Sequence, residues 1–300
     1  MSKKYKIYQV DAFTREKFKG NPAGVVLNAD GLTDAQMQSI ARELNNSETA
    51  FLFQPESQDH DVRIRFFTPS LEVPSCGHAT IAAHYVRAIE NHFPSCQVWH
   101  KINIGTLPVA VVKDEDYRIV MTQAAVEFLD IIEGKNRETL LSALQLTHAD
   151  LVEGAPIQIV STGHSKVIIA LKHRDKLHRL HPDLKSLRDL SQIIGCNGYF
   201  IFTLDTDEPG ILSHARMFAP AIGISEDPVT GNGNGPLGAY LVRYGLTEHD
   251  GEKLQFTSKQ GEAMGRPGSV QVTVGIEQQK PVKVKVAGHA VIVFKTEIEI

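Results

Sequence analysis

The chain of 300 residues has little cysteine, one tryptophan and no long apolar run. Its three cysteines, Cys76, Cys96 and Cys196, are too few for a disulfide framework, and their spacing is not that of a zinc site. Reduced thiols in a cytoplasmic protein are the simpler interpretation. The N-terminal residues lack the apolar segment of a signal peptide, and no run approaches the roughly 20 apolar residues that span a bilayer. We therefore expect a cytoplasmic protein without a membrane partner.

Positive charge is not in excess either. The 31 Lys and Arg residues are outnumbered by 35 Asp and Glu residues, which gives a net charge of −4. This balance argues against nucleic acid as a partner, because phosphate binding requires a basic surface. The 13 histidines are scattered, so no metal is expected. A hydrophobic fraction of 42% is typical of a soluble globular protein, and the length suits two domains.

Strand-like segments alternate with two helix-like ones. Residues 33–45 form an amphipathic stripe, and Thr33 with Gln36 forms a capping-box pattern. Residues 77–89 are rich in alanine and lack a wide polar face, which is typical of a buried helix. Strands are expected at 7–12, 24–27, 49–53, 62–67, 98–122 (a meander), 254–256, 270–274, 282–286 and 291–294.

A weak internal repeat is the most informative pattern. Four blocks of the first half recur in the same order in the second: 65–69 (RFFTP) resembles 216–220 (RMFAP), and 76–87 resembles 230–243. Such self-similarity predicts repeated structural units. We therefore expect two similar halves, each a set of antiparallel strands around a helix of small residues, with a boundary near residues 124–139.

The two expected central helices begin at Gly77-His78 and at Gly231-Asn232. A helix N-terminus offers free N–H groups and a partial positive charge, which suits a carboxylate. If the halves face each other across a cleft, both helix starts would converge there. The alternative is that both glycines only form turns before buried helices.

Three further side chains are candidates for chemistry. Glu48 lies where a polar turn enters an apolar strand, and a carboxyl group there can transfer protons or simply be solvated. His78 could hydrogen-bond a substrate or be a core histidine. Asp227, held extended before Pro228, could bind an amino or hydroxyl group or cap the next turn.

Residues 233–238 (GNGPLG) fit the dinucleotide pattern GxGxxG. The pattern has weight only between a strand and a helix, and here Glu-Asp-Pro precedes it and a proline lies inside it. A dinucleotide-dependent oxidoreductase therefore remains only an alternative.

Seven motifs along nearly the whole chain carry a resemblance. They are DAFT (11–14), GNPAGV (20–25), NSETAF (46–51), FTP (67–69), EVP (72–74), CGHAT (76–80) and EDPVTG (226–231). Together they resemble the PhzF-like isomerase family of phenazine biosynthesis, and this chain is most similar to its bacterial YddE-type members.

The resemblance implies an α+β fold like that of diaminopimelate epimerase, with two pseudo-symmetric domains that each wrap a β-barrel-like antiparallel sheet around a central helix. The domains would comprise residues 1–124, completed by a returning C-terminal strand at 288–300, and residues 125–287, with the active site in the cleft between them. A homodimer would be unsurprising.

The resemblance also implies roles for residues. It places the catalytic carboxylate on Glu48, and it places Gly77, His78 and Asp227 in the substrate pocket together with Gly231 and Asn232. Phenazine-pathway enzymes often have serine at the position of Asn232, which argues against the phenazine precursor as substrate.

Epimerases of this fold use two thiols, one on each face of the substrate carbon. Cys76 matches one of them, but its symmetry mate is Thr230, whose hydroxyl is too weakly acidic to replace a thiol. The leading hypothesis is therefore a cofactor-independent isomerase in which Glu48 moves a proton between carbons of a small carboxylic or amino acid. The alternative from another class is a ligand-binding or interaction protein that keeps the cleft without turnover.

Overall fold

The computed structural model describes residues 3–300, which form two units. The first unit runs to Met121 and includes Ala287–Ile300, and the second comprises Thr122–Val286. Among the described residues, no helix has both the length and the apolar character needed to cross a bilayer.

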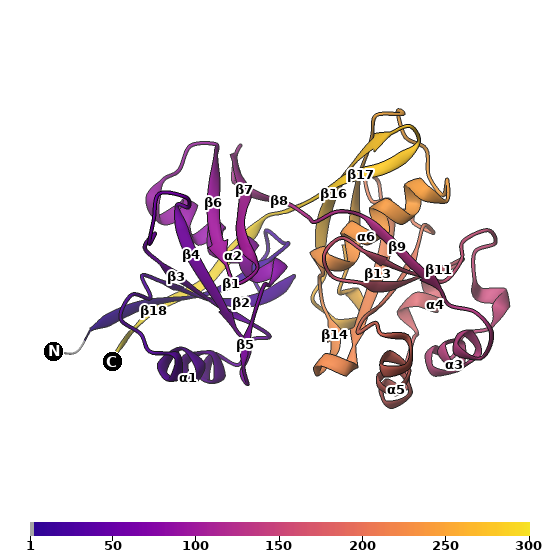
Figure 1. The fold of residues 1–300 in the computed structure, drawn as a ribbon, viewed down its shortest axis with the longest axis horizontal. Helices are drawn as coiled ribbons and strands as arrows, with labels where there is room; N and C mark the ends of the chain where they lie inside the picture. The colour runs from indigo at the N-terminus through magenta and orange to yellow at the C-terminus, as the bar shows by residue number, and fades with distance from the viewer. Residues whose placement is uncertain (1–2) are drawn as a thin grey trace. The chain divides into compact units, whose positions relative to one another are not determined.

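Nine strands and two helices build the first unit (Figure 1). In chain order they are β1 (Lys4–Ala12), β2 (Asn21–Leu27), α1 (Asp34–Leu44), β3 (Thr49–Phe53), β4 (Val62–Phe67), β5 (Glu72–Val73), α2 (Gly77–Asn91), β6 (Cys96–Ile102), β7 (Gly105–Lys113), β8 (Tyr117–Thr122) and β18 (Ala290–Glu299).

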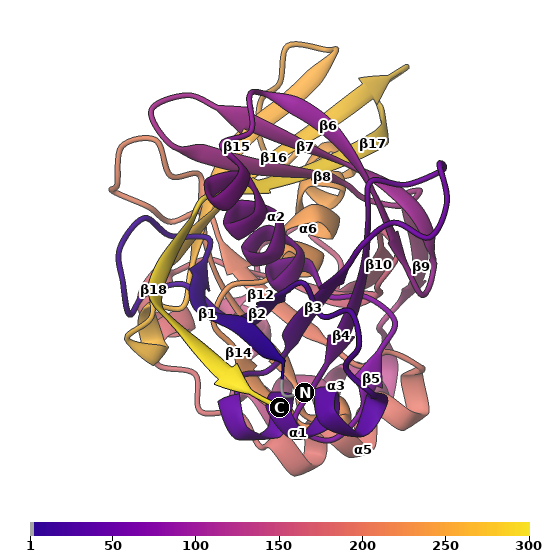
Figure 2. The same cartoon turned by 90° about the vertical axis from the view of Figure 1, so that its left-hand side faces the viewer.

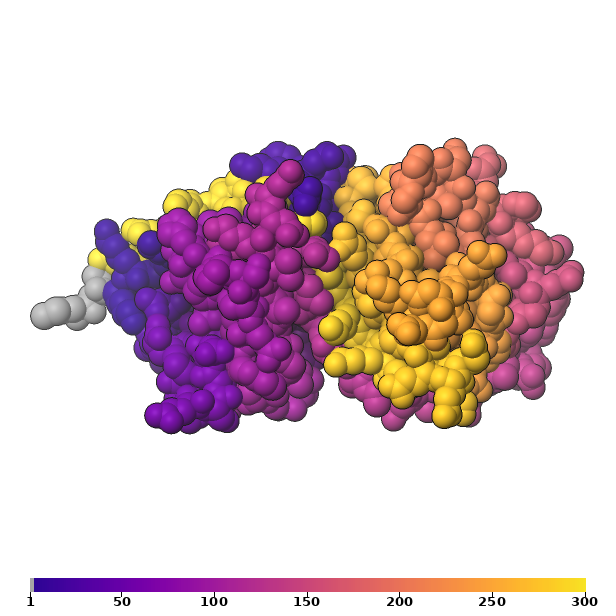
Figure 3. Space-filling model, turned by 90° about the horizontal axis from the view of Figure 1, so that it is seen from above, coloured from indigo at the N-terminus to yellow at the C-terminus, as the bar shows by residue number. Residues whose placement is uncertain are grey.

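Helix α2 is the centre of the first unit. Strands surround it on several sides (Figure 2), and most of its side chains, His78 to Val86 without a break, are buried. Burial therefore explains why α2 lacks a polar face, as the sequence indicated. The N- and C-terminal strands lie together (Figure 3), because β18 pairs antiparallel with β1 from Lys4↔Glu299 to Ala12↔Ala290.

The second unit repeats this plan with more helix. Its elements are β9 (Glu127–Ile131), α3 (Gly134–Leu144), η1 (His148–Asp150), β10 (Gln158–Ser161), β11 (Lys166–Leu171), α4 (Arg174–His178), α5 (Leu184–Ile194), β12 (Tyr199–Thr203), β13 (Ser213–Ala219), η2 (Pro220–Ile222), β14 (Ile224–Asp227), α6 (Gly231–Arg243), β15 (Lys253–Gln260), η3 (Glu262–Met264), β16 (Gly268–Glu277) and β17 (Lys280–Gly288).

The sheets are mixed, a feature that the expected antiparallel strands did not include. In the first unit β2 pairs parallel with β3 and β4 pairs parallel with β6; in the second, β11 pairs parallel with β12 and β13 with β15. Parallel neighbours require a crossover, which α1 and α2 supply in one unit and α4–α5 and α6 in the other. The α+β class and the repeated architecture stand as expected.

Local signals explain where the helices begin. Thr33 caps α1 through its side chain and Gln36 reaches back to the Thr33 N–H at 2.9 Å, so the capping box is formed. Helices α2 and α6 begin differently: Cys76 and Thr230 occupy the N-cap positions in extended conformation, and neither side chain caps its helix.

Candidate functional site

The turn that carries Glu48 is fixed by its neighbours. Helix α1 ends at Asn45 in the left-handed conformation, and the Asn46 side chain exchanges two hydrogen bonds with Gln9, at 2.9 and 2.8 Å. The Glu48 carbonyl accepts the Gly24 N–H at 3.2 Å. The backbone of Glu48 is therefore held on both sides, while its side chain remains available for other contacts.

The Glu48 carboxylate is nearly enclosed, with 13% of the side chain exposed. Its Oε2 atom is buried and has no hydrogen-bond partner among the described residues, although the Nε2 atom of His78 lies 3.3 Å away. A buried carboxylate oxygen without a hydrogen bond destabilises the folded protein, so its presence here calls for an explanation. It can accept a proton or a hydrogen bond from a bound molecule.

His78 connects Glu48 to the start of α2. Its Nε2 atom lies 3.2 Å from the Ser47 hydroxyl, and its Nδ1 atom lies 3.5 Å from the Cys76 thiol. The ring is buried, with 8% of it exposed. Contacts at both nitrogens hold the imidazole in one orientation beside the carboxylate. The expected juxtaposition of Glu48, Gly77 and His78 is therefore present in the first unit.

The second unit has its own polar cluster, at the start of α6. The Thr230 hydroxyl donates a hydrogen bond to the Asp227 carboxylate. The buried Gln260 amide accepts the Thr230 N–H at 3.1 Å and donates to the Asp227 carbonyl at 2.8 Å. The Asp227 carboxylate is therefore bonded to the N-cap residue of α6 and lies beside the helix start.

Sequence reasoning missed three amides in this cluster. Gln123 donates to the Gly231 carbonyl at 3.2 Å and lies 3.4 Å from the Asn232 Oδ1 atom. Asn234, fully buried, donates to the Thr230 carbonyl at 2.9 Å, and its Oδ1 atom has no hydrogen-bond partner among the described residues. Gln260 is the third. Gln123 lies between β8 and β9, Asn234 lies in α6 and Gln260 lies in β15, so only the tertiary fold brings them together.

Lys166 is a further residue that the sequence did not single out as chemical. Its aliphatic chain lies over Gly198, where an added Cβ would come within 2.6 Å of the lysine Cδ. Burial lowers the pKa of Lys166, while the thiol of Cys196 and the carboxyl group of Asp227 act in the opposite direction. The second unit therefore brings a desolvated cation close to Asp227.

The glycines of residues 233–238 have a packing role. They lie inside α6, and a Cβ at Gly233 would meet the Phe200 ring at 2.2 Å, while one at Gly238 would meet Val274 at 2.7 Å. The segment is thus not the turn between strand and helix that a dinucleotide site uses. Close approach of the sheet to the helix explains these glycines.

Two groups of side chains bring possible metal ligands within 4.8 Å of one another: Glu48, Cys76 and His78 in the first unit, and His178, His214 and Glu262 in the second. In the second group the side chains contact one another directly. His214 Nδ1 lies 2.7 Å from Glu262 Oε2, and Lys259 lies 3.5 Å from the other oxygen of that carboxylate.

Comparison with known proteins identifies the family of this chain. A model of the phenazine biosynthesis-like protein family (PhzC-PhzF) matches residues 10–296. The chain belongs to the phenazine biosynthesis-like family. An uncharacterized isomerase of Clostridium acetobutylicum is 56% identical over 99% of both chains, and the uncharacterized isomerase YddE of Escherichia coli is 50% identical over 98% of both.

Two structures extend the comparison. A Bacillus anthracis phenazine biosynthesis protein of the PhzF family is 32% identical, with a TM-score of 0.88 over 99% of this chain and 100% of that one. A hydroxyproline epimerase of Agrobacterium vitis shares the fold, with a TM-score of 0.64 at 11% identity over 99% of this chain and 93% of that one. The second likeness shows the fold alone, whereas the curated relatives of this chain are named isomerases and place it in the isomerase class.

One relative carries a named reaction. The trans-2,3-dihydro-3-hydroxyanthranilate isomerase of Pseudomonas aeruginosa is 30% identical over 93% of this chain and 94% of its own length. This chain has Asn232 in the second position of α6, with its side chain beside Gln123.

Proposed function

We propose that this chain is a cofactor-independent isomerase that moves a proton between two carbons of a small carboxylic or amino acid, with Glu48 as the single acid and base. The observation that carries the proposal is the buried Oε2 atom of Glu48, which has no hydrogen-bond partner among the described residues. Membership of a family whose curated relatives are named isomerases supports it.

The reaction needs one base and a place for negative charge. Glu48 takes a proton from a substrate C–H bond, and the electron pair of that bond delocalises toward the adjacent carboxylate or double bond. Protonated Glu48 then returns the proton to a second carbon, so no oxidant or reductant is consumed. The uncapped start of α2 at Gly77 offers N–H groups and a positive dipole end to the developing charge.

The other groups orient rather than react. His78 stands 3.3 Å from the Glu48 carboxylate and can hydrogen-bond the substrate next to the base. In the second unit we assign substrate binding to Asp227, Gly231 and Asn232, which lie together where α6 begins. A homodimer is proposed on the family resemblance alone, and a cytoplasmic location on the three free cysteines.

The test is incorporation of deuterium from heavy water, detected by NMR, with a panel of amino, hydroxy and unsaturated carboxylic acids that includes trans-2,3-dihydro-3-hydroxyanthranilate. Glu48→Gln keeps the shape of the side chain and removes the base, so exchange should fall by about a thousandfold or more. Glu43→Gln, at an exposed position of α1, is the matched control and should exchange like the unaltered protein.

Exchange retained in Glu48→Gln would overturn the role of Glu48. Tight binding of a panel member with no deuterium entering it would favour the ligand-binding alternative instead.

A further inference from the structure

Two imidazole rings of the second unit point at one carboxylate oxygen. His178 ends α4, His214 lies in β13 and Glu262 begins η3. The His214 Nδ1 atom lies 2.7 Å from the Glu262 Oε2 atom, and the His178 Nε2 atom lies 3.3 Å from the same oxygen. All three atoms lie within 4.8 Å of one another. The residues are far apart in the chain, so the spacing of the histidines in the sequence did not indicate this cluster.

The distances are close to those of a tetrahedral metal site. Zinc holds nitrogen and oxygen ligands at about 2.0–2.2 Å, so any two of them lie about 3.3 Å apart. The His178–Glu262 distance already has this value. The His214–Glu262 distance has to widen by about 0.6 Å to reach it. The buried Nε2 atom of His178 has no hydrogen-bond partner among the described residues, so no hydrogen bond is lost there.

An ion would lie between these three atoms, and it can enter from one side of the cluster. The side chains of His178 and Glu262 are 33% and 21% exposed, so the cluster is open to solvent at that side. Three protein ligands leave the fourth tetrahedral position for water.

The remaining contacts of His214 suit a metal ligand. Its ring is fully buried, and its Nε2 atom lies 3.2 Å from the Thr206 hydroxyl. The ring is therefore held by the nitrogen that does not face Glu262. Metal-binding histidines are commonly oriented in this way, through a contact at the second nitrogen.

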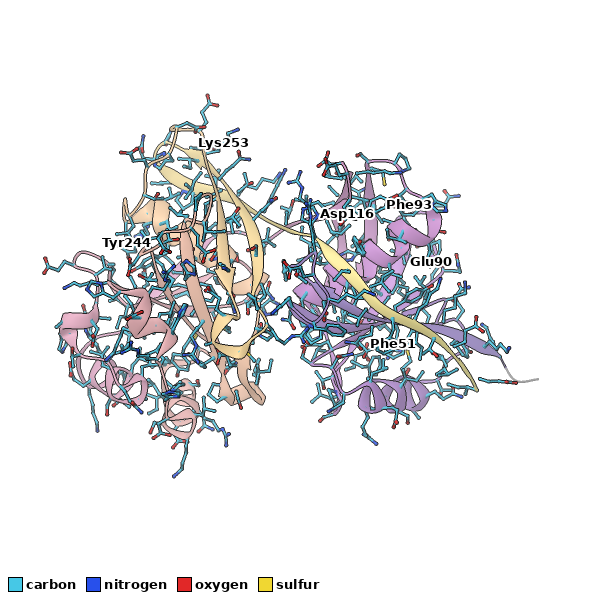
Figure 4. The ribbon with its side chains drawn as sticks, turned by 180° about the vertical axis from the view of Figure 1, so that it is seen from behind. Phe51, Glu90, Phe93, Asp116, Tyr244 and Lys253 are labelled. Carbon is cyan, nitrogen blue, oxygen red and sulfur yellow. The ribbon has the colours of Figure 1, made fainter. Side chains whose placement is uncertain are left out.

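Negative charge surrounds the cluster. Lys259 lies on β15, the strand that begins at Lys253, which Figure 4 labels. Its ammonium group lies 3.5 Å from the Oε1 atom of Glu262, the oxygen that neither imidazole faces, and Glu208 holds the same group at 2.7 Å. This lysine and Arg174 are outnumbered by four carboxylates, those of Asp205, Asp207, Glu208 and Glu262. The charges near the cluster therefore favour a bound cation.

The first unit has no histidine at the corresponding position. Its strands β4 and β6 place Arg63 opposite Lys101, as β13 and β15 place His214 opposite Lys259. Both cations of the first unit pair with Glu56. A permanent positive charge thus occupies the place that an imidazole has in the second unit. The second unit has a possible metal ligand where the first has a fixed cation.

The group around Glu48 is less suited to a single ion. His78 turns its Nε2 atom toward Glu48 and its Nδ1 atom toward Cys76. The two ring nitrogens point in different directions, so one ion cannot have all three residues as ligands in this orientation. In the second unit, by contrast, both imidazoles face the same carboxylate oxygen.

We propose that His178, His214 and Glu262 bind a divalent transition-metal ion of the zinc class, with water in the fourth position. Two imidazoles and a carboxylate suit zinc, whereas magnesium and calcium prefer oxygen ligands alone. The ion joins α4, β13 and η3, so it stabilises the folded second unit. The site is separate from the Glu48 cluster and does not depend on the proposed reaction.

The test is calorimetric titration of the full chain, first treated with EDTA, with zinc chloride and separately with magnesium chloride. We expect zinc to bind and magnesium to give no binding heat. Cys76→Ala should bind zinc as tightly as the unaltered protein does, because the thiol is not a ligand of this site. Cobalt(II) chloride is the spectroscopic probe: the complex should show the visible absorption of tetrahedral cobalt without a sulfur-to-cobalt charge-transfer band.

Two variants and a control make the test decisive. His178→Gln and Glu262→Gln should each weaken zinc binding at least tenfold, because substitutions in the outer shell of a metal site already cost that much. His178 is partly exposed, so its replacement leaves the core intact. His148→Gln, in the exposed ion pair with Glu138, is the matched control and should bind zinc normally.

Thermal unfolding gives a second readout. Zinc should raise the Tm of the unaltered protein but not that of His178→Gln, because an ion that binds only the folded state stabilises it. The proposal is wrong if the EDTA-treated protein binds no zinc, if magnesium binds as well as zinc, or if His178→Gln binds zinc as tightly as the unaltered protein. Loss of binding in Cys76→Ala would place the ion at the Glu48 cluster and would also overturn it.

Discussion

The two units build the same arginine clamp. In the first, Arg65 makes a bidentate ion pair with Glu72, with hydrogen bonds of 2.8 and 2.7 Å, and its guanidinium group lies over the Phe67 ring. In the second, Arg216 pairs with Glu226 in the same way, with two bonds of 2.8 Å, and lies over Phe218. The repeat seen in the sequence thus corresponds to a repeated ion pair that joins the two antiparallel strands before the central helix, β4–β5 in one unit and β13–β14 in the other.

The strand register shows where the units diverge. Thr49 lies opposite Phe67 in the first unit, and Tyr199 lies opposite Phe218 in the second. The residue before each is Glu48 in one case and Gly198 in the other, and the Lys166 chain covers Gly198. At the helix starts, Cys76 of the first unit corresponds to Thr230 of the second. The framework is therefore repeated but the reactive groups are not, which fits one base rather than a symmetric pair.

The clamps differ in their third contact, and this gives the largest expected effect on stability. The Nη1 atom of Arg216 donates to the buried Leu177 and Leu180 carbonyls, at 3.1 and 2.8 Å, whereas Arg65 reaches the exposed Asp34. Arg216→Met leaves Glu226 and those carbonyls unsatisfied, so we expect a loss of about 3–5 kcal/mol in the free energy of unfolding.

Arg65→Met is the matched variant. It should lower the free energy of unfolding by about 1–3 kcal/mol, because Asp34, one of the partners of Arg65, is exposed to solvent. Urea unfolding followed by circular dichroism measures both. Equal losses would show that the two clamps are energetically equivalent, contrary to the difference in burial.

Acid should destabilise the first unit through a pair of buried histidines. His84 and His100 are buried, with the His84 Nε2 atom 3.2 Å from the His100 Nδ1 atom, and burial lowers both pKa values, that of His100 to about 4. The unfolded chain takes up protons below about pH 6.5 while the folded unit does not, so stability falls as pH decreases from about 6.5 to 4. His100 alone accounts for up to ~3 kcal/mol of this loss.

The second unit contains one such histidine, His164, whose pKa burial lowers. It also contains Glu262, whose pKa is lowered to about 2; burial opposes this shift, and the hydrogen bond and charge of His214 outweigh it. The Glu262 carboxylate stabilises the folded unit. Its contribution is complete above about pH 4.5 and is lost only as the pH falls toward 2. Trp99, the single tryptophan, lies in the first unit and reports on it by fluorescence.

The measurement is the slope of the unfolding free energy against pH between 6.5 and 4. His100→Asn should flatten this slope, while His181→Asn, at an exposed position, should leave it unchanged. A slope that is the same in His100→Asn would remove the buried histidine pair as its cause.

The sequence predicted those parts that local signals specify. Thr33 and Gln36 define the start of α1 because the capping box involves four adjacent residues, and strands β3 and β4 begin and end where their β-branched and aromatic runs do. The repeat indicated two equivalent helix starts, and the motif around Glu48 indicated the carboxylate.

The sequence could not reveal contacts between distant segments, nor which buried polar atoms lack a hydrogen bond. Gln260 reaches Asp227 only because β15 pairs parallel with β13, a contact that no local pattern encodes. Lys166 gains significance from lying over Gly198, and the Oε2 atom of Glu48 from a hydrogen bond that it does not make. Whether a buried polar atom lacks a partner is a property of the packed structure alone.

Substitutions of Cys76 and Thr230, the two N-cap residues, should have the smallest effects on activity. Cys76 lies 3.5 Å from His78 and directly before Gly77, so it is close enough to act if the chemistry were symmetric. With Glu48 as the only base, Cys76→Ala should lower deuterium exchange by less than about tenfold, which is under ~1.4 kcal/mol of transition-state stabilisation. Thr230→Val, which removes the hydroxyl bonded to Asp227, should raise KM more than it lowers kcat. A loss in Cys76→Ala as large as in Glu48→Gln would mean that the thiol shares the proton transfer, and the first unit would then carry two reactive groups where the second carries none.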